Sequence, residues 1–190
     1  MTGQELLAKF RELGALKTGH FQLTSGLHSG QYMQCAAIFE YPKAASEIIK
    51  LLIPKLPQDI DTVIAPAIGG INLGYEVARA LQCRFVFTER EQGKMALRRG
   101  FTLTAGEKVL VVEDVVTTGG SVREVIEIAR CHGCLVQVVA CLVDRSQGKV
   151  DFPAPFIPLM RMEIETFQPD QCPLCAANLP ITKPGSRTVK

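Results

Sequence analysis

Short apolar runs alternate with longer amphipathic segments through the middle of the chain. The runs DTVIAPA, CRFVFTE, EKVLVVED and CLVQVVACLVD predict buried strands at residues 61–67, 83–89, 107–114 and 134–144. Apolar residues then recur every three or four positions after residue 71, and again over 121–133, which predicts two helices. Strands separated by helices indicate βαβ units. We therefore expect an α/β fold with a mostly parallel central sheet flanked by helices and right-handed crossovers.

The two ends of the chain carry weaker patterns. Residues 4–13 and 42–52 predict helices, the second opened by a proline in its first turn. Residues 18–34 are rich in Gly, Ser and Thr with short apolar alternations, which indicates a hairpin-like excursion. The proline-rich tail from about 150 is expected to fold back over the body as a cap. A length of 190 residues fits one domain, 1–190.

Four loops each follow a predicted strand: 66–71, 88–104, 113–121 and 144–148. In open parallel sheets, ligands bind beyond the carboxyl ends of the strands. We therefore expect these loops to gather at one edge and form the site. The loop 88–104 itself has few structural signals.

Two adjacent acids, Glu113 and Asp114, end one of these strands in the run VLVVEDVVTTGGSVREV. Neighbouring carboxylates repel each other and are costly to desolvate, so a core has no use for them. The following loop, 117–121, places backbone N–H groups at a helix N-terminus, which favours anions. The GxxxxGK[ST] and GxGxxG spacings are absent, so one monophosphate is the expected ligand, with the acids facing ribose hydroxyls or a metal. The plain alternative is that the acids cap a strand and the glycines only make a turn.

Charge and hydropathy narrow the functional class. The formal net charge is +2, from 21 basic and 19 acidic residues, and no basic run of the nucleic-acid type is present. No apolar run reaches the length of a membrane span, and the charged N-terminus does not resemble a signal peptide. We therefore expect neither a nucleic-acid nor a membrane partner, and a cytoplasmic setting.

Seven cysteines fit a reducing compartment better than a disulfide framework. Cys131 and Cys134 form one CxxC pair, and Cys172 and Cys175 form another; two such pairs can make a four-cysteine zinc site. The first pair flanks a glycine of the helix C-cap type, however, so local backbone geometry already explains it. We favour a local turn staple or a redox-sensitive thiol pair for the second. The three histidines, His20, His28 and His132, lack metal-ligand spacing and are expected to have ordinary roles, although His28 lies in a segment that could reach the substrate.

The run at 109–125 resembles the phosphoribosyl pyrophosphate signature of type I phosphoribosyltransferases. The segments GHFQLTSGLHS, APAIGG, TEREQGK, LVDRSQGK and CPLCAANLPITKPGSR resemble orotate phosphoribosyltransferases, in family order and across nearly the whole chain. This resemblance implies the type I fold, with a hood made from about 15–40 and 150–190. It implies the transfer of ribosyl phosphate from phosphoribosyl pyrophosphate to N1 of orotate in de novo pyrimidine synthesis, with Mg²⁺ assisting. It also implies a homodimer in which a mobile loop closes over the partner's site.

The resemblance assigns roles to individual residues. Lys94 and Asp114 are implied as catalytic, with Arg90 and Lys94 reaching the pyrophosphate. The donor-binding set is Glu113, Asp114, Val115, Val116, Thr117, Thr118, Gly119, Gly120 and Ser121, in which the acids hold the ribose hydroxyls and 117–121 hold the 5′-phosphate. Thr117 and Arg145 are implied to contact orotate. Ala67, Ile68, Gly69 and Gly70 match the pyrophosphate loop, where we hypothesise a strained peptide near Ala67. Mg²⁺ is expected to bind through the substrate rather than through dedicated protein ligands.

Several positions depart from the family pattern. Gly69, Thr24, Glu91 and Ala96 stand where many members carry a lysine, an arginine or a histidine, and the neighbouring Arg98 and Arg99 are candidates to replace the missing charges.

Ordinary alternatives remain for two key side chains. Lys94 could be a solvated loop lysine, and Arg145 could form a surface salt bridge with Asp144. Two rival functions also stay open. One is a phosphoribosyltransferase for a purine or another base, and the other is a non-catalytic phosphoribosyl pyrophosphate sensor.

Overall fold

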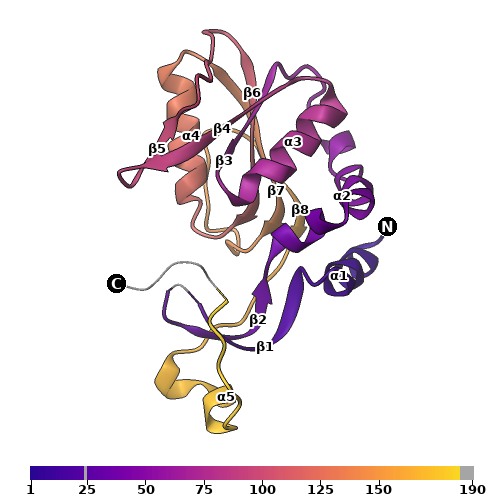
Figure 1. The fold of residues 1–190 in the computed structure, drawn as a ribbon, viewed down its shortest axis with the longest axis vertical. Coiled ribbons are helices and arrows are strands. Elements are labelled where there is room, and N and C mark those ends of the chain that lie inside the picture. The colour runs from indigo at the N-terminus through magenta and orange to yellow at the C-terminus, as the bar shows by residue number, and fades with distance from the viewer. Residues whose placement is uncertain (24, 185–190) are drawn as a thin grey trace.

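The body of the protein is built on one six-stranded sheet. The computed structural model describes residues 1–23 and 25–184 (Figure 1). The sheet order is β5-β4-β3-β6-β7-β8. The strands are β3 (Thr62–Pro66), β4 (Arg84–Glu91), β5 (Lys94–Leu97), β6 (Lys108–Val116), β7 (Leu135–Asp144) and β8 (Phe156–Arg161). All neighbours pair in parallel except β4 and β5, so the expected mostly parallel α/β sheet is confirmed.

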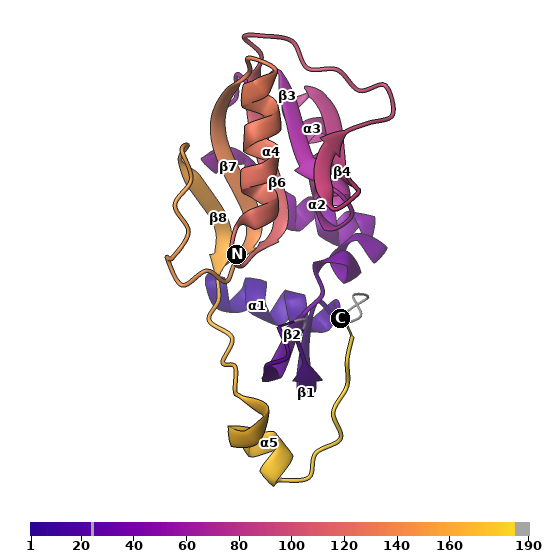
Figure 2. The ribbon, with the colours of Figure 1, turned by 90° about the vertical axis from the view of Figure 1, so that its left-hand side faces the viewer.

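Helices cover both faces of this sheet (Figure 2). The helices α2 (Pro42–Ile49) and α3 (Gly69–Leu81) lie on one face, and α4 (Gly120–Cys131) lies on the other. Successive strand side chains point to opposite faces, so Leu110 and Val112 pack with the first layer while Val109 and Val111 pack with the second. Because both faces are covered, the central strands read as continuous apolar runs.

A smaller unit sits at the carboxyl edge of the sheet, and we call it the hood: residues 16–33 and 162–184. It contains the antiparallel hairpin of β1 (Leu16–Gln22) and β2 (His28–Met33), next to α1 (Gly3–Glu12). The short helix α5 (Pro173–Ala176) lies in the tail, which returns to the hairpin through the bridges Phe21↔Thr182 and His28↔Phe167. Short 3-10 turns occur at η1 (Cys35–Glu40), η2 (Ile53–Lys55) and η3 (Pro169–Gln171).

The structure corrects three expectations about these elements. Residues 156–161 are not part of the hood but form the edge strand β8, because they pair in parallel with β7. The segment 88–104 is not patternless: β4 and β5 form a hairpin whose turn, Gln92 and Gly93, has φ values of 50° and 84°. The helix expected over 42–52 ends at Ile49. Thr24 and the last six residues of the predicted hood lie outside the described residues.

The two remaining expectations at the chain ends hold. The hairpin-like excursion is confirmed by β1 and β2, and Pro42 does begin α2. Among the described residues, no helix is long and apolar enough to cross a bilayer.

Candidate functional site

A cavity of about 850 Å³ lies between the sheet and the hood. Figure 2 shows the carboxyl ends of the parallel strands facing the hood. The body contributes Asp114, Thr117, Thr118 and Arg145 to the lining, and the hood contributes residues on the opposite wall. Two of the four predicted strand-end loops, 113–121 and 144–148, therefore line this cavity, and the loop 66–71 packs against the first of them.

The acid pair sits half-buried at the end of β6. The Asp114 Oδ1 accepts a hydrogen bond from the Val115 N–H at 2.8 Å, and the Glu113 Oε1 accepts one from the Asp114 N–H at 3.2 Å. Burial raises the pKa of both carboxyl groups, and the neighbouring charge of Asp114 raises the pKa of Glu113 further. In the described chain, neither carboxylate belongs to an ion pair. The pair is therefore open to a cation or to hydroxyl donors from a ligand.

The loop that begins α3 packs directly against these acids. A Cβ added at Gly69 would lie 2.8 Å from both carboxylate oxygens of Asp114, and one added at Gly70 would lie 3.3 Å from the Glu113 Oε1. In this protein a side chain at position 69, where many family members carry a lysine, would displace the Asp114 carboxylate from its present position. The Ala67–Ile68 peptide bond in this loop is cis.

The loop 117–121 forms a small second cavity of about 170 Å³ at the N-terminus of α4. The N-cap residue Gly119 has a φ of 74°, which favours glycine, and a Cβ there would lie 2.8 Å from the Phe152 ring. No side chain caps this helix, so its first N–H groups face the cavity without a side-chain acceptor. The Arg123 guanidinium braces the loop by donating to the Thr118 carbonyl at 2.7 Å. The result is a rigid anion cradle beside the acid pair.

Arg145 directly follows β7 and lines the large cavity. Its backbone N–H donates to the Val116 carbonyl at 2.8 Å, and its side-chain Nε is buried without a hydrogen-bond partner among the described residues. Desolvation lowers the pKa of this guanidinium. The alternative of a salt bridge with Asp144 is wrong: Asp144 accepts from the Ser146 N–H at 2.8 Å and from its Oγ at 2.6 Å, and it pairs with Arg161 at 3.4 Å. The arginine fork is thus free to meet an anionic ligand.

The β4–β5 hairpin lies apart from this cavity and projects from the body (Figure 1). Arg90 forms a two-pronged ion pair with Glu124 on α4, at 2.8 and 3.1 Å. Lys94 is exposed at the start of β5, and its side-chain Nζ has no hydrogen-bond partner within the described residues. The structure does not bring either residue to the cavity of its own chain.

Arg98 and Arg99, the candidates to replace the missing charges, both form ion pairs with residues of β4. Arg98 pairs with Glu91 at 3.3 Å, and Arg99 pairs with Glu89 at 2.6 Å. These contacts hold both guanidinium groups away from the acid pair.

Comparison with known proteins identifies the family. The family model for the phosphoribosyl transferase domain matches residues 34–155. An orotate phosphoribosyltransferase from Caldicellulosiruptor bescii is 53% identical over 188 residues, covering 98% of this chain and 99% of that protein. The chain belongs to the orotate phosphoribosyltransferase family.

Solved structures support the same fold. The orotate phosphoribosyltransferase from Aeropyrum pernix superposes with a TM-score of 0.74 at 24% identity, covering 83% of this chain and 93% of that chain. The adenine phosphoribosyltransferase from Rhodothermus marinus gives 0.64 at 21% identity, covering 82% and 99%. At these identities the likeness shows the fold alone, and that fold is shared between families acting on different bases. The expected type I phosphoribosyltransferase fold is confirmed.

The family resemblance did not single out several lining residues. Tyr32, Gln34 and Cys35 come from the end of β2 and the start of η1, and Ile164 and Thr166 come from the tail. Tyr32 and Gln34 lie within the segment 18–34 that was predicted as a hairpin-like excursion, which was the available signal. The tail residues carried no such signal, because the path of the chain after β8 brings them to the cavity.

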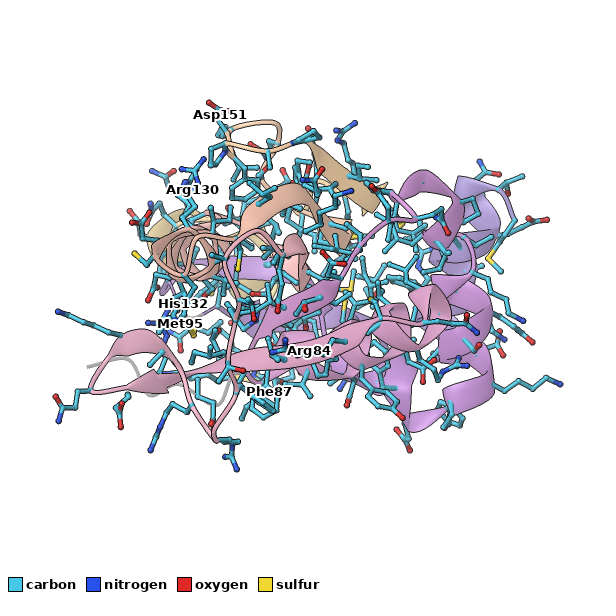
Figure 3. All side chains as sticks on the ribbon, turned by 90° about the horizontal axis from the view of Figure 1, so that it is seen from above. Arg84, Phe87, Met95, Arg130, His132 and Asp151 are labelled. Carbon is cyan, nitrogen blue, oxygen red and sulfur yellow. The ribbon has the colours of Figure 1, made fainter. Side chains whose placement is uncertain are left out.

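The structure excludes two less favoured alternatives for the cysteines and histidines. Cys131 ends α4 and Cys134 follows it, at the end of the body away from the hood that contains Cys172 and Cys175 (Figure 2). Figure 3 looks down on the body from that far end and labels His132, which lies between the first two cysteines. The four-cysteine zinc site is therefore wrong. His28 does not line the large cavity but is buried inside the hood.

Proposed function

We propose that this protein transfers ribosyl phosphate from phosphoribosyl pyrophosphate to N1 of orotate, giving orotidine 5′-monophosphate and pyrophosphate. The observation that carries the proposal is the buried, unpartnered Nε of Arg145 in the same cavity as Asp114 and Thr117. An arginine fork matches the planar carboxylate of orotate, and Thr117 adds a hydroxyl beside it. The full-length similarity to orotate phosphoribosyltransferases supports the same assignment.

The donor would occupy the other half of the site. Its 5′-phosphate fits the cradle at 117–121, where small residues and free N–H groups face a cavity of about 170 Å³. Glu113 and Asp114 would accept hydrogen bonds from the ribose hydroxyls, and the loop 67–70, packed against them, would meet the pyrophosphate. The two carboxylates also favour positive charge developing on the ribose as the bond to pyrophosphate breaks.

A divalent cation is consistent with this family, and we propose that it is Mg²⁺ carried by the donor. Burial raises the pKa of Glu113 and Asp114, and a cation beside them would stabilise their charged forms. When bound, Mg²⁺ would neutralise part of the negative charge on the departing pyrophosphate. The protein's own share is to hold the ribose, orient the base and exclude water.

Lys94 and Arg90 are proposed to act on the pyrophosphate of a partner subunit. The support is that their hairpin projects away from the cavity of its own chain. A homodimer would let each hairpin close over the other subunit's site and keep water from the donor. We treat residues 1–190 as one domain. The seven cysteines, all free, fit a reducing cytoplasmic setting.

The testing experiment follows the loss of orotate ultraviolet absorbance with donor and Mg²⁺ present. Parallel reactions contain adenine, guanine, hypoxanthine or uracil. Turnover of orotate alone is expected. Turnover of a purine without orotate would overturn the base assignment, and tight donor binding without any turnover would favour a sensor.

A further inference from the structure

Four potential metal ligands converge inside the hood, outside the site described above. His20 lies on β1, His28 begins β2, and Cys172 and Cys175 flank the start of α5. Their ligand atoms all lie within 4.8 Å of one another. His20, His28 and Cys172 are 5%, 7% and 3% exposed, while Cys175 is accessible to solvent. Residues more than 150 positions apart in the sequence are thus gathered around one point.

The distances between these atoms fit a tetrahedral ion. The His20 Nε2 lies 3.1 Å from the His28 Nδ1, 3.6 Å from the Cys172 Sγ and 3.7 Å from the Cys175 Sγ. The Cys175 Sγ lies 3.2 Å from the His28 Nδ1. Ordinary zinc–nitrogen and zinc–sulfur bonds at tetrahedral angles place two nitrogens about 3.3 Å apart and a nitrogen and a sulfur about 3.6 Å apart. A zinc ion therefore fits between the four atoms with small adjustments.

The surroundings also prepare His20 as a ligand. Its Nδ1 lies 2.9 Å from the Leu179 carbonyl oxygen, which can only accept a hydrogen bond. The proton must therefore sit on Nδ1, which leaves the Nε2 lone pair directed at the cluster. Zinc-bound histidines typically donate their other ring N–H to a carbonyl or carboxylate in this way.

The tail of the hood has little else to hold it. Between residues 165 and 184, Cys172 is the one buried residue. Apart from the cluster, the tail is joined to the hairpin by the two isolated bridges described above, by the hydrogen bond from the Ser29 Oγ to the Glu165 carbonyl, and by the contact between the His20 Nδ1 and the Leu179 carbonyl. A segment with so small an apolar core usually needs a covalent or metal staple to stay folded.

We propose that His20, His28, Cys172 and Cys175 bind one structural zinc ion that fastens the tail to the β1–β2 hairpin. Two thiolates and two imidazoles in a closed set are characteristic of structural zinc. Binding releases the two thiol protons to solvent and changes no oxidation state. The four ligands lie outside residues 34–155, so the phosphoribosyl transferase domain model does not include them.

The test measures metal directly, in the full chain. Wild-type protein, stripped of metal and reloaded with Zn²⁺ under reducing conditions, should hold about one zinc per chain by mass spectrometry. With Co²⁺ in place of zinc, it should give the visible absorption of a tetrahedral thiolate site. Cys175→Ser should weaken zinc binding by about a hundredfold or more. The matched control is Cys131→Ser, which removes an exposed cysteine at the far end of α4 and should leave zinc binding unchanged.

A second measurement covers the case in which Cys175→Ser does not fold. Chelation of the wild-type protein should make the tail, 162–184, sensitive to limited proteolysis, and added Zn²⁺ should reverse this. Three results would each overturn the proposal: a reloaded wild type without bound zinc, equal zinc loss in Cys131→Ser, or a Cys172–Cys175 disulfide in the protein as purified. Proteolysis of the tail that is indifferent to chelation would also contradict it.

Discussion

Replacing Arg145 by methionine should weaken the recognition of orotate while making the folded protein more stable. The substitution keeps a long side chain but removes the guanidinium that faces the cavity. A hydrogen bond to a charged partner contributes about 1.5–3 kcal/mol, and about 1.4 kcal/mol corresponds to a factor of ten. The kcat/KM for orotate should therefore fall by about 10- to 150-fold. The buried Nε that lacks a partner disappears as well, so the free energy of unfolding without ligand should rise by about 1 kcal/mol.

The assay pairs orotate kinetics with urea unfolding of the ligand-free protein. Arg161→Met is the control, because Arg161 carries the same charge beside Asp144 but does not line the large cavity. The control should leave orotate kinetics within about twofold of wild type, because the Arg161 side chain is exposed and the buried Asp144 keeps its two hydrogen bonds from Ser146. If Arg145→Met turns over orotate as well as wild type, or if both variants lose activity equally, the reasoning about Arg145 is refuted.

Four further predictions concern the donor half of the site. Lys94→Ala should lower kcat far more than donor affinity, because the lysine acts on the departing charge; equal losses in steady-state kinetics and donor titration would contradict this role. If the hairpin acts on the partner subunit's site, mixing Lys94→Ala with Asp114→Asn subunits should restore about a quarter of wild-type activity. Random pairing makes half of the dimers mixed, and each mixed dimer then has one intact site out of two. A hairpin that acts on the site of its own subunit would restore no activity. The pKa of Glu113 is raised in the folded state, so its stabilising contribution is present below its ordinary pKa of 4.5 and is lost as pH rises through the folded value. Glu113→Gln should therefore be more stable than wild type in urea at pH 8 but not at pH 4. A stability difference that is the same at both pH values would be evidence against a raised pKa. Gly69→Ala should weaken donor binding by displacing the Asp114 carboxylate, while Gly3→Ala, where an added Cβ meets nothing within 4 Å, should not; equal affinities in calorimetric titration would show that the close contact is unimportant.

The central part of the fold could be predicted because its pattern is local. Four strand cores and the helices after two of them follow directly from apolar runs and helical periodicity. The anion cradle at 117–121 was predicted for the same reason, since a glycine-rich turn between a strand and a helix N-terminus is a common anion-binding site. Edge strands were harder: the residues of β8 are largely apolar, but the proline among them argues against a strand. The β4–β5 hairpin was missed because residues 89–91 at the end of β4 are all charged and β5 has only four residues.

The contacts inside the hood could not be predicted, because they are long-range. His20 and His28 do not stand in a helical repeat, and Cys172 is separated from His20 by 152 positions. Neither pair satisfies a metal motif alone. The hairpin brings the histidines together, and the returning tail adds the cysteines, so the set exists only in three dimensions. Likewise, the charge of Arg90 suggested a phosphate contact, but no local pattern indicated its partner Glu124 on a different helix.

The wall that the hood adds to the cavity has a consequence for how the protein is made. Ile164 and Thr166 line the base side of the cavity, yet they follow β8 and are among the later residues to leave the ribosome. A nascent chain that ends after β8 already contains every strand of the sheet, the anion cradle and the acid pair. It also contains the part of the cavity wall that comes from β2, but it still lacks the part that comes from the tail. The proposed sugar-phosphate site would therefore be complete in a growing chain before the cavity that is proposed to hold the base.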